Sequence, residues 1–92
     1  MNGAEIAPLL AAAAREDEAG FLGQGARLAS AGGDAVSGWR GIALALNAAG
    51  QPAWAARAQR QTVRAGRDTP GLRLDDEAFL GDLLLRAGDL NG

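Results

Sequence analysis

Apolar residues recur every three or four positions along most of this chain, and a glycine follows most of the segments in which they do so. Such spacing lines one face of an α-helix, and a glycine just past it is a common helix stop. No segment sustains the alternation of apolar and polar residues that a half-buried strand shows. The pattern predicts five helices, over about residues 4–15, 18–31, 35–49, 52–65 and 75–87.

The clearest of these helices lies in the middle of the chain. Trp39, Ile42 and Leu46 are spaced by three and four residues, so they fall on one helical face. Asp34 stands just before this helix and is a suitable N-cap, because its carboxylate can accept a hydrogen bond from a backbone N–H of the first turn. The next helix begins at Pro52, whose fixed φ suits a first helical turn. With the preceding glycine, this proline predicts a short turn between two neighbouring helices.

The pattern is less regular at two places. Pro8 interrupts the first predicted helix and marks either a kink or its true first turn. The segment 66–76, GRDTPGLRLDD, is the one long connection that we predict. Asp75, Asp76 and Glu77 then open the last helix, where negative charge interacts favourably with the helix dipole.

The composition indicates one small domain and excludes several functions. The chain has 92 residues, a formal net charge of −2 and a pI of about 4.9, which argues against binding to the phosphates of nucleic acid. It contains no cysteine and no histidine, so thiolate and imidazole metal ligands are absent. We expect no membrane span and no signal peptide, and hence a cytoplasmic protein. All nine basic residues are arginine, a bias that we interpret as that of a GC-rich bacterial genome.

Candidate catalytic groups are few. Without histidine, cysteine, lysine and tyrosine, only carboxylates and arginines are available as general acids or bases. The acidic runs at 16–18 and 75–77 could be imagined as magnesium ligands, but each is more easily explained as a solvated turn or a helix start. We therefore predict no enzyme activity, no catalytic residue, no cofactor and no metal site.

The central helices carry an ordered set of large and small residues. A large aromatic residue, an aliphatic and small pair, an aliphatic residue, a turn glycine and a small residue follow one another at Trp39, Ile42, Ala43, Leu46, Gly50 and Ala55. This order resembles a tetratricopeptide repeat over residues 36–69, a helical hairpin with a period of about 34 residues. The segment FLGDLLLRAGDL resembles the first helix of a following repeat, with Leu80, Gly81, Leu84 and Gly88 in register.

The resemblance implies a fold and a function. It implies an all-α protein whose five helices pair as antiparallel hairpins in a right-handed stack. Residues 2–34 form a degenerate first hairpin, 36–69 the repeat-like hairpin, and 75–88 a final helix that we expect to be unpaired. The family binds other proteins, so the resemblance implies an adaptor or chaperone. The needle-subunit co-chaperones of bacterial type III secretion are similar in length and architecture.

We expect the partner to be an amphipathic helix of another protein, held in an apolar groove. On the central helix, the groove would be supported by Trp39, Ile42 and Leu46. On the last helix, the partner would be contacted directly by Leu80, Leu84 and Leu85. A second apolar stripe on the last helix, Leu74, Ala78 and Leu85, would mark an interface, unless Leu85 simply remains exposed or the last helix caps the stack. Trp39 and Trp54 are interpreted as packing anchors.

Two other functions remain open. In the first, the chain is a structural accessory subunit or a self-associating bundle, in which the second apolar stripe is covered permanently. In the other, it is a helix-turn-helix regulator that uses a basic helical face, formed by Arg57, Arg60 and Arg64. These three arginines contact an acidic partner or form a solvated surface.

Overall fold

The structure is a computed structural model that describes residues 3–31, 33–66 and 70–88. Within these ranges the chain forms five helices and no strand, which confirms the predicted all-α fold. The helices are α1 (Gly3–Ala14), α2 (Glu18–Ala31), α3 (Ala35–Ala48), α4 (Pro52–Ala65) and α5 (Pro70–Ala87). The predicted bounds of the first four agree with these to within one residue at each end.

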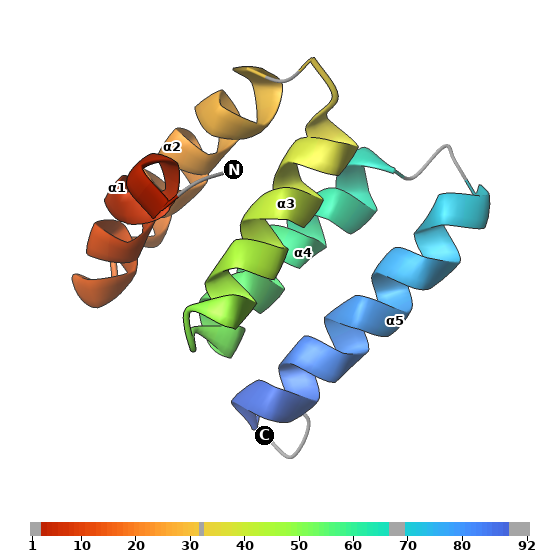
Figure 1. Cartoon of the computed structure of the whole chain (residues 1–92). Coiled ribbons are helices and arrows are strands. Elements are labelled where there is room, and N and C mark those ends of the chain that lie inside the picture. The colour runs from red at the N-terminus through yellow and green to blue at the C-terminus, as the bar shows by residue number, and fades with distance from the viewer. Residues whose placement is uncertain (1–2, 32, 67–69, 89–92) are drawn as a thin grey trace.

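Helices that follow one another in the chain are neighbours in space. Figure 1 shows α1 and α2 as one hairpin, α3 and α4 as a second hairpin beside it, and α5 on the far side of the second. The most extensive contacts join α3 to α4 and α4 to α5. The molecule measures 35 × 33 × 21 Å, so the helices form a flat stack rather than a round bundle.

The predicted ends of α3 and α4 are confirmed. Asp34 caps α3, because its carboxylate accepts hydrogen bonds from the Val36 backbone N–H at 3.0 Å and from the Ser37 hydroxyl at 2.8 Å. Gly50 has a φ of 78°, a left-handed conformation that glycine adopts without strain, and it ends the turn after α3. Pro52 is the first residue of α4.

Two features differ from the sequence prediction. The last helix begins at Pro70 and not at residue 75, so the long connection predicted over 66–76 is wrong. A proline is well suited to a first helical turn because its missing N–H would have no partner there. The acidic residues predicted to open the helix therefore lie in its second turn. Pro8 lies inside α1, so it does not mark the first turn of that helix.

Small residues let the helices approach one another closely. Alanines fill much of the core, and Ala29, Ala43, Ala55 and Ala58 have no exposed surface. A Cβ atom at Gly38 of α3 would lie 2.5 Å from the Cα and from the carbonyl oxygen of Ala29 on α2. The bulk of the core comes from a few large side chains, among which Phe21, Leu9, Ile42, Leu46 and Leu83 are fully buried.

Candidate protein-binding groove

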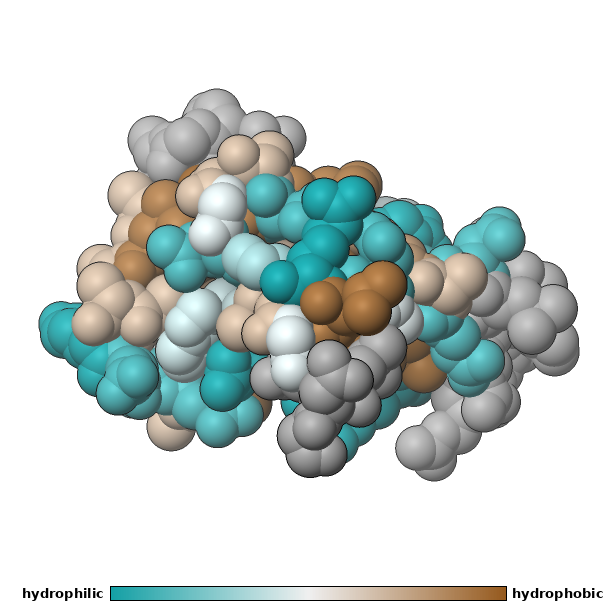
Figure 2. Space-filling model, turned by 90° about the horizontal axis from the view of Figure 1, so that it is seen from below, coloured by the Kyte–Doolittle hydropathy of each residue, from teal (hydrophilic) through white to brown (hydrophobic). Residues whose placement is uncertain are grey.

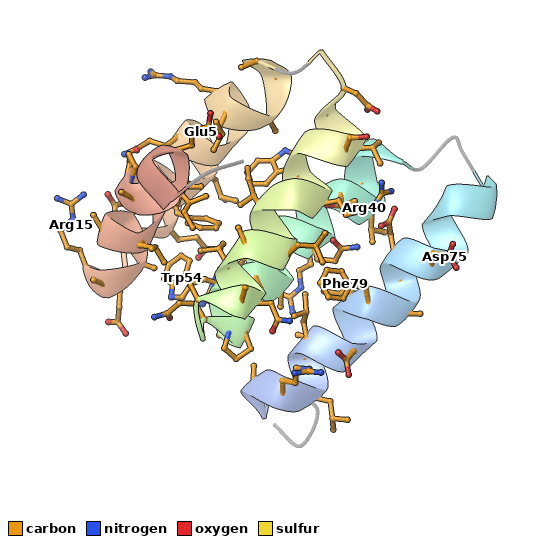
Figure 3. The ribbon with its side chains drawn as sticks, in the orientation of Figure 1. Glu5, Arg15, Arg40, Trp54, Asp75 and Phe79 are labelled. Atoms are coloured by element: carbon orange, nitrogen blue, oxygen red, sulfur yellow. The ribbon has the colours of Figure 1, made fainter. Side chains whose placement is uncertain are left out.

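A groove runs between α3 and α5 on the surface of the stack. It has a volume of about 390 Å3 and is lined by Arg40, Leu44, Asp75, Asp76 and Phe79. Figure 3 shows Arg40 on α3 and Phe79 on α5, both on the sides of their helices that face each other. Leu44 keeps 53% of its surface exposed, and Phe79 is half-buried. The groove thus offers an aliphatic and an aromatic side chain next to charged groups.

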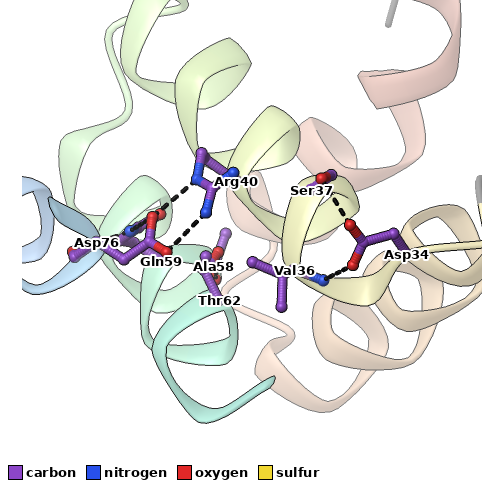
Figure 4. Close-up of polar contacts among 8 residues, drawn as sticks. All are labelled: Asp34, Val36, Ser37, Arg40, Ala58, Gln59, Thr62 and Asp76. Carbon is purple, nitrogen blue, oxygen red and sulfur yellow. Dashed lines mark hydrogen bonds and ion pairs between the residues drawn. The ribbon is translucent and has the colours of Figure 1, made fainter. Parts of the chain in front are cut away.

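The charged end of the groove is held by a hydrogen-bonded cluster from three helices (Figure 4). Arg40 of α3 donates from Nε to Asp76 Oδ1 at 2.8 Å and from a terminal nitrogen to Oδ2 at 2.7 Å. Gln59 of α4 donates from Nε2 to the Asp76 carbonyl oxygen at 2.9 Å and to Oδ1 at 3.1 Å. The Asp76 side chain is only 3% exposed and that of Arg40 is 31% exposed. One carboxylate therefore joins α3, α4 and α5.

The cluster is ionised at neutral pH. The hydrogen bonds from Arg40 lower the pKa of Asp76 below its ordinary value, and this effect outweighs the opposing effect of burial. The same hydrogen bonds raise the pKa of Arg40. Arg40 and Asp76 compensate each other, whereas Asp75 is exposed at the rim. The lining of the groove, with one arginine and two aspartates, therefore carries a formal charge of −1.

The residues predicted for partner binding are divided between the core and the surface. Trp39, Ile42 and Leu46 are buried in the core, which is compatible with a supporting role and leaves almost no surface for direct contact. Leu80 and Leu84 are half-buried and pack against the core.

Leu85 stands apart from the groove. It is 62% exposed and lies two residues after the fully buried Leu83, about 200° around the helix, so it points away from the core. Ala78, which shares its predicted stripe, is also exposed, whereas the side chain of Leu74 lies outside the described residues. The structure thus separates Leu85 from the groove-lining residues.

The basic face of α4 lies in a second hollow, between α2 and α4. Arg57, Arg60 and Arg64 line this hollow together with Glu18, Leu22 and Gln61. The Arg57 guanidinium stacks on Trp54, 4.2 Å from the ring centroid, and Trp54 also contacts Phe21 with ring centroids 4.9 Å apart. Trp39 and Trp54 are both buried, so their interpretation as packing anchors is confirmed.

Arg40 and Leu44 line the groove but were not predicted to do so. They are four residues apart and so share a helical face beside the predicted core face of α3, which is the only local indication of their position. The hydrogen-bond partner of Arg40, Asp76, lies 36 residues further along the chain, and the spacing of residues within one helix cannot predict a contact of that sequence separation. Asp76 is engaged by this arginine, and no group of three or more acidic residues in the described ranges is placed to hold a metal ion.

None of the five described helices has both the length and the apolar character of a membrane span. Comparison with protein-family models, with curated proteins and with solved structures finds no match to this chain.

Proposed function

We propose that this protein is an interaction module, an adaptor or chaperone that holds an amphipathic helix of another protein in the groove between α3 and α5. The observation that carries the proposal is Leu44, a large apolar side chain left half-exposed beside Phe79 between two helices. An apolar groove between helices is a common receptor for the apolar face of a partner helix. Exposed apolar and aromatic side chains are the contacts that such a face buries.

The arrangement of the helices supports the same proposal. Two consecutive hairpins and a fifth helix lie side by side in chain order (Figure 1), as in a stack of tetratricopeptide-like repeats. In such a stack each repeat contacts its neighbours and leaves an extended surface for binding. On the face seen in Figure 2, hydrophilic side chains lie between hydrophobic ones and interrupt the apolar surface.

The groove also defines the chemistry of its partner. Leu44 and Phe79 would receive apolar residues spaced by three or four positions on one face of the partner helix. Asp75 at the rim would attract a lysine or arginine beside that face, because Arg40 already compensates Asp76. The proposed partner is therefore an amphipathic helix with a basic residue at the border of its apolar face.

The test uses helical peptides selected from a displayed library on the immobilised protein. We expect the enriched peptides to share this pattern of apolar and basic positions. Leu44→Asp should weaken their binding at least about tenfold, because burial of a leucine side chain contributes about 1.5–3 kcal/mol. Leu85→Asp is the matched control, since it makes the same change on a side of α5 that points away from the core. Affinities are measured by fluorescence anisotropy of labelled peptides.

The paired variants also distinguish the two apolar surfaces. Circular dichroism should show unchanged helix content in both, because both leucines are exposed. Loss of binding in Leu85→Asp with full binding in Leu44→Asp would place the partner on the outer face of α5 and contradict the proposed groove.

A second function is favoured by the exposure of Leu85. A structural accessory subunit or a self-associating bundle would cover this side chain permanently, and its 62% exposed surface is the observation in favour of that alternative. A single exposed leucine is nevertheless common on monomeric proteins. The oligomeric state in solution separates the two functions.

A further inference from the structure

We propose that the hollow between α2 and α4 is a second binding site, which receives an acidic helical segment of another protein through Arg57, Arg60 and Arg64. This site is separate from the groove between α3 and α5, and none of its lining residues is shared with that groove. The inference does not depend on the helix-holding function proposed above.

Positive charge is concentrated in this hollow. The three arginines line one hollow of about 120 Å3, with Glu18 as the only acidic residue among the lining side chains. Three arginines and one glutamate give a local formal charge of +2, whereas the whole chain has a formal net charge of −2. Positive charge is thus gathered here against the sign of the molecule, which favours a small anionic partner.

Most of this positive charge is uncompensated by carboxylates of the described residues. Arg60 and Arg64 are exposed, and neither guanidinium has a carboxylate partner within the described residues. Arg57 Nε lies 3.8 Å from Glu18 Oε1, a long contact between a half-buried and an exposed side chain, which contributes little to stability. Its guanidinium is instead positioned by stacking on Trp54 and by a hydrogen bond of 3.4 Å to the Ala53 carbonyl oxygen. Two free cations and one positioned cation are therefore available to a ligand.

The spacing of the arginines defines the form of that ligand. Residues 57, 60 and 64 lie on one face of α4 and extend over about 10 Å along the helix axis. A partner helix laid alongside α4 presents carboxylates at the same intervals when its acidic residues are three and four positions apart. Each guanidinium can then bind a carboxylate with two hydrogen bonds. An acidic helix suits the site better than nucleic acid, whose many phosphates the acidic molecule as a whole repels.

The test compares two synthetic helical peptides of identical composition. In the first, three glutamates lie on one face at intervals of three and four residues, and in the second they are distributed around the helix. We expect the first peptide to bind more tightly, with an affinity that falls as salt is added. Arg60→Gln and Arg64→Gln should each weaken its binding about two- to fivefold. Arg15→Gln, which removes one exposed charge from the end of α1, is the control and should leave binding unchanged.

Three results would overturn the proposal. They are equal binding of the two peptides, an effect of Arg15→Gln as large as that of Arg60→Gln, and no detectable binding at low salt. A single-stranded oligonucleotide that binds more tightly than the first peptide, with the same dependence on Arg60 and Arg64, would show that the site takes nucleic acid instead. Leu44→Asp should not alter binding of the acidic peptide, so failure here and failure of the groove are distinguishable.

Discussion

At the scale of single residues, Asp76 is the group on which the position of α5 depends. A nearly buried carboxylate costs free energy unless it is paired and hydrogen-bonded. Arg40, on α3, donates hydrogen bonds to both carboxylate oxygens of Asp76. Gln59, on α4, donates to one of these oxygens and to the backbone carbonyl of Asp76. These bonds fix the second turn of α5 against the two other helices. We therefore expect Asp76 to contribute more to stability than the exposed carboxylates of α5.

Asp76→Asn tests this expectation. The amide keeps the shape of the side chain, but it cannot accept hydrogen bonds from Arg40 at both atoms and leaves the guanidinium without its counter-charge. We expect the free energy of unfolding, measured by urea denaturation, to fall by about 2 kcal/mol. Asp82→Asn is the control on the same helix, because Asp82 forms an exposed pair with Arg86 and its loss should cost less than about 0.5 kcal/mol. Equal effects of the two variants would show that the cluster does not hold α5.

The cluster also predicts how stability depends on pH. Because the pKa of Asp76 lies below its ordinary value of 3.8 in the folded protein, its ionised form stabilises the fold above about pH 4. This contribution is lost as the pH falls through the lowered pKa. Hydrogen bonds from Ser37 and Val36 lower the pKa of Asp34 as well, so its contribution changes in the same direction. We expect acid to destabilise the wild type more steeply than Asp76→Asn in urea denaturation at decreasing pH; parallel curves would contradict this.

The two aspartates also show which polar contacts the sequence could predict. Asp34 acts on residues two and three positions away, and its role as an N-cap follows from local spacing alone. Asp76 belongs to a run of three acidic residues that all fit a helix start equally well. Only the packing of α5 against α3 and α4 selects the middle one for burial beside Arg40. Contacts of this kind depend on tertiary structure, so periodicity could not reveal them.

At the scale of helices, local rules explain most of the secondary structure and fail at one boundary. Repeated apolar positions and the stops at Gly33, Gly50 and Gly88, each with positive φ, place the ends of three helices well. The start of α5 was misplaced because proline and glycine at 70 and 71 were interpreted as loop residues, although proline also suits the first turn of a helix. Local rules do not predict how closely two helices approach, because that depends on small residues that face each other across the two helices.

Gly38→Ala tests the close approach of α2 and α3. Its new methyl group would collide with the backbone of Ala29, which can move only with its helix. We expect the free energy of unfolding to fall by about 1–3 kcal/mol. Gly23→Ala is the matched control, since a Cβ atom there would meet no other atom within 4 Å and alanine favours the helix by about 0.5–1 kcal/mol. Thermal or urea unfolding should therefore shift in opposite directions, and stabilisation by both changes would refute the close contact.

At the scale of the whole molecule, function depends on which helix faces remain open once the helices have stacked. The sequence predicted an apolar groove served by α3 and α5 but not the residues that line it, because the lining depends on the distance and rotation of two helices. Leu44 lies four residues after Arg40 on α3, and it lines the groove together with Phe79 of α5. Leu85 was predicted as a contact because it belongs to a second apolar stripe on the last helix, and the structure places it on a side of α5 that points away from the core.

This arrangement predicts a monomer in the absence of a partner. Light scattering over a concentration series should give a constant mass near 9.3 kDa, because the two exposed leucines, Leu44 and Leu85, lie on separate surfaces that each expose too little apolar area to stabilise a dimer. Leu85→Asp should leave that mass unchanged. A dimer that Leu85→Asp converts to a monomer would instead support the self-associating function.

The most direct test of the groove is the response of backbone amide chemical shifts to a selected amphipathic peptide. Isotope-labelled protein is titrated with the peptide, and the shift changes are mapped onto the helices. We predict that the largest shift changes surround Arg40 and Leu44 on α3 and Asp75 and Phe79 on α5. The amides near Leu85 should show much smaller shift changes. Changes centred on Leu85 or on the hairpin of α1 and α2 would contradict the proposed function.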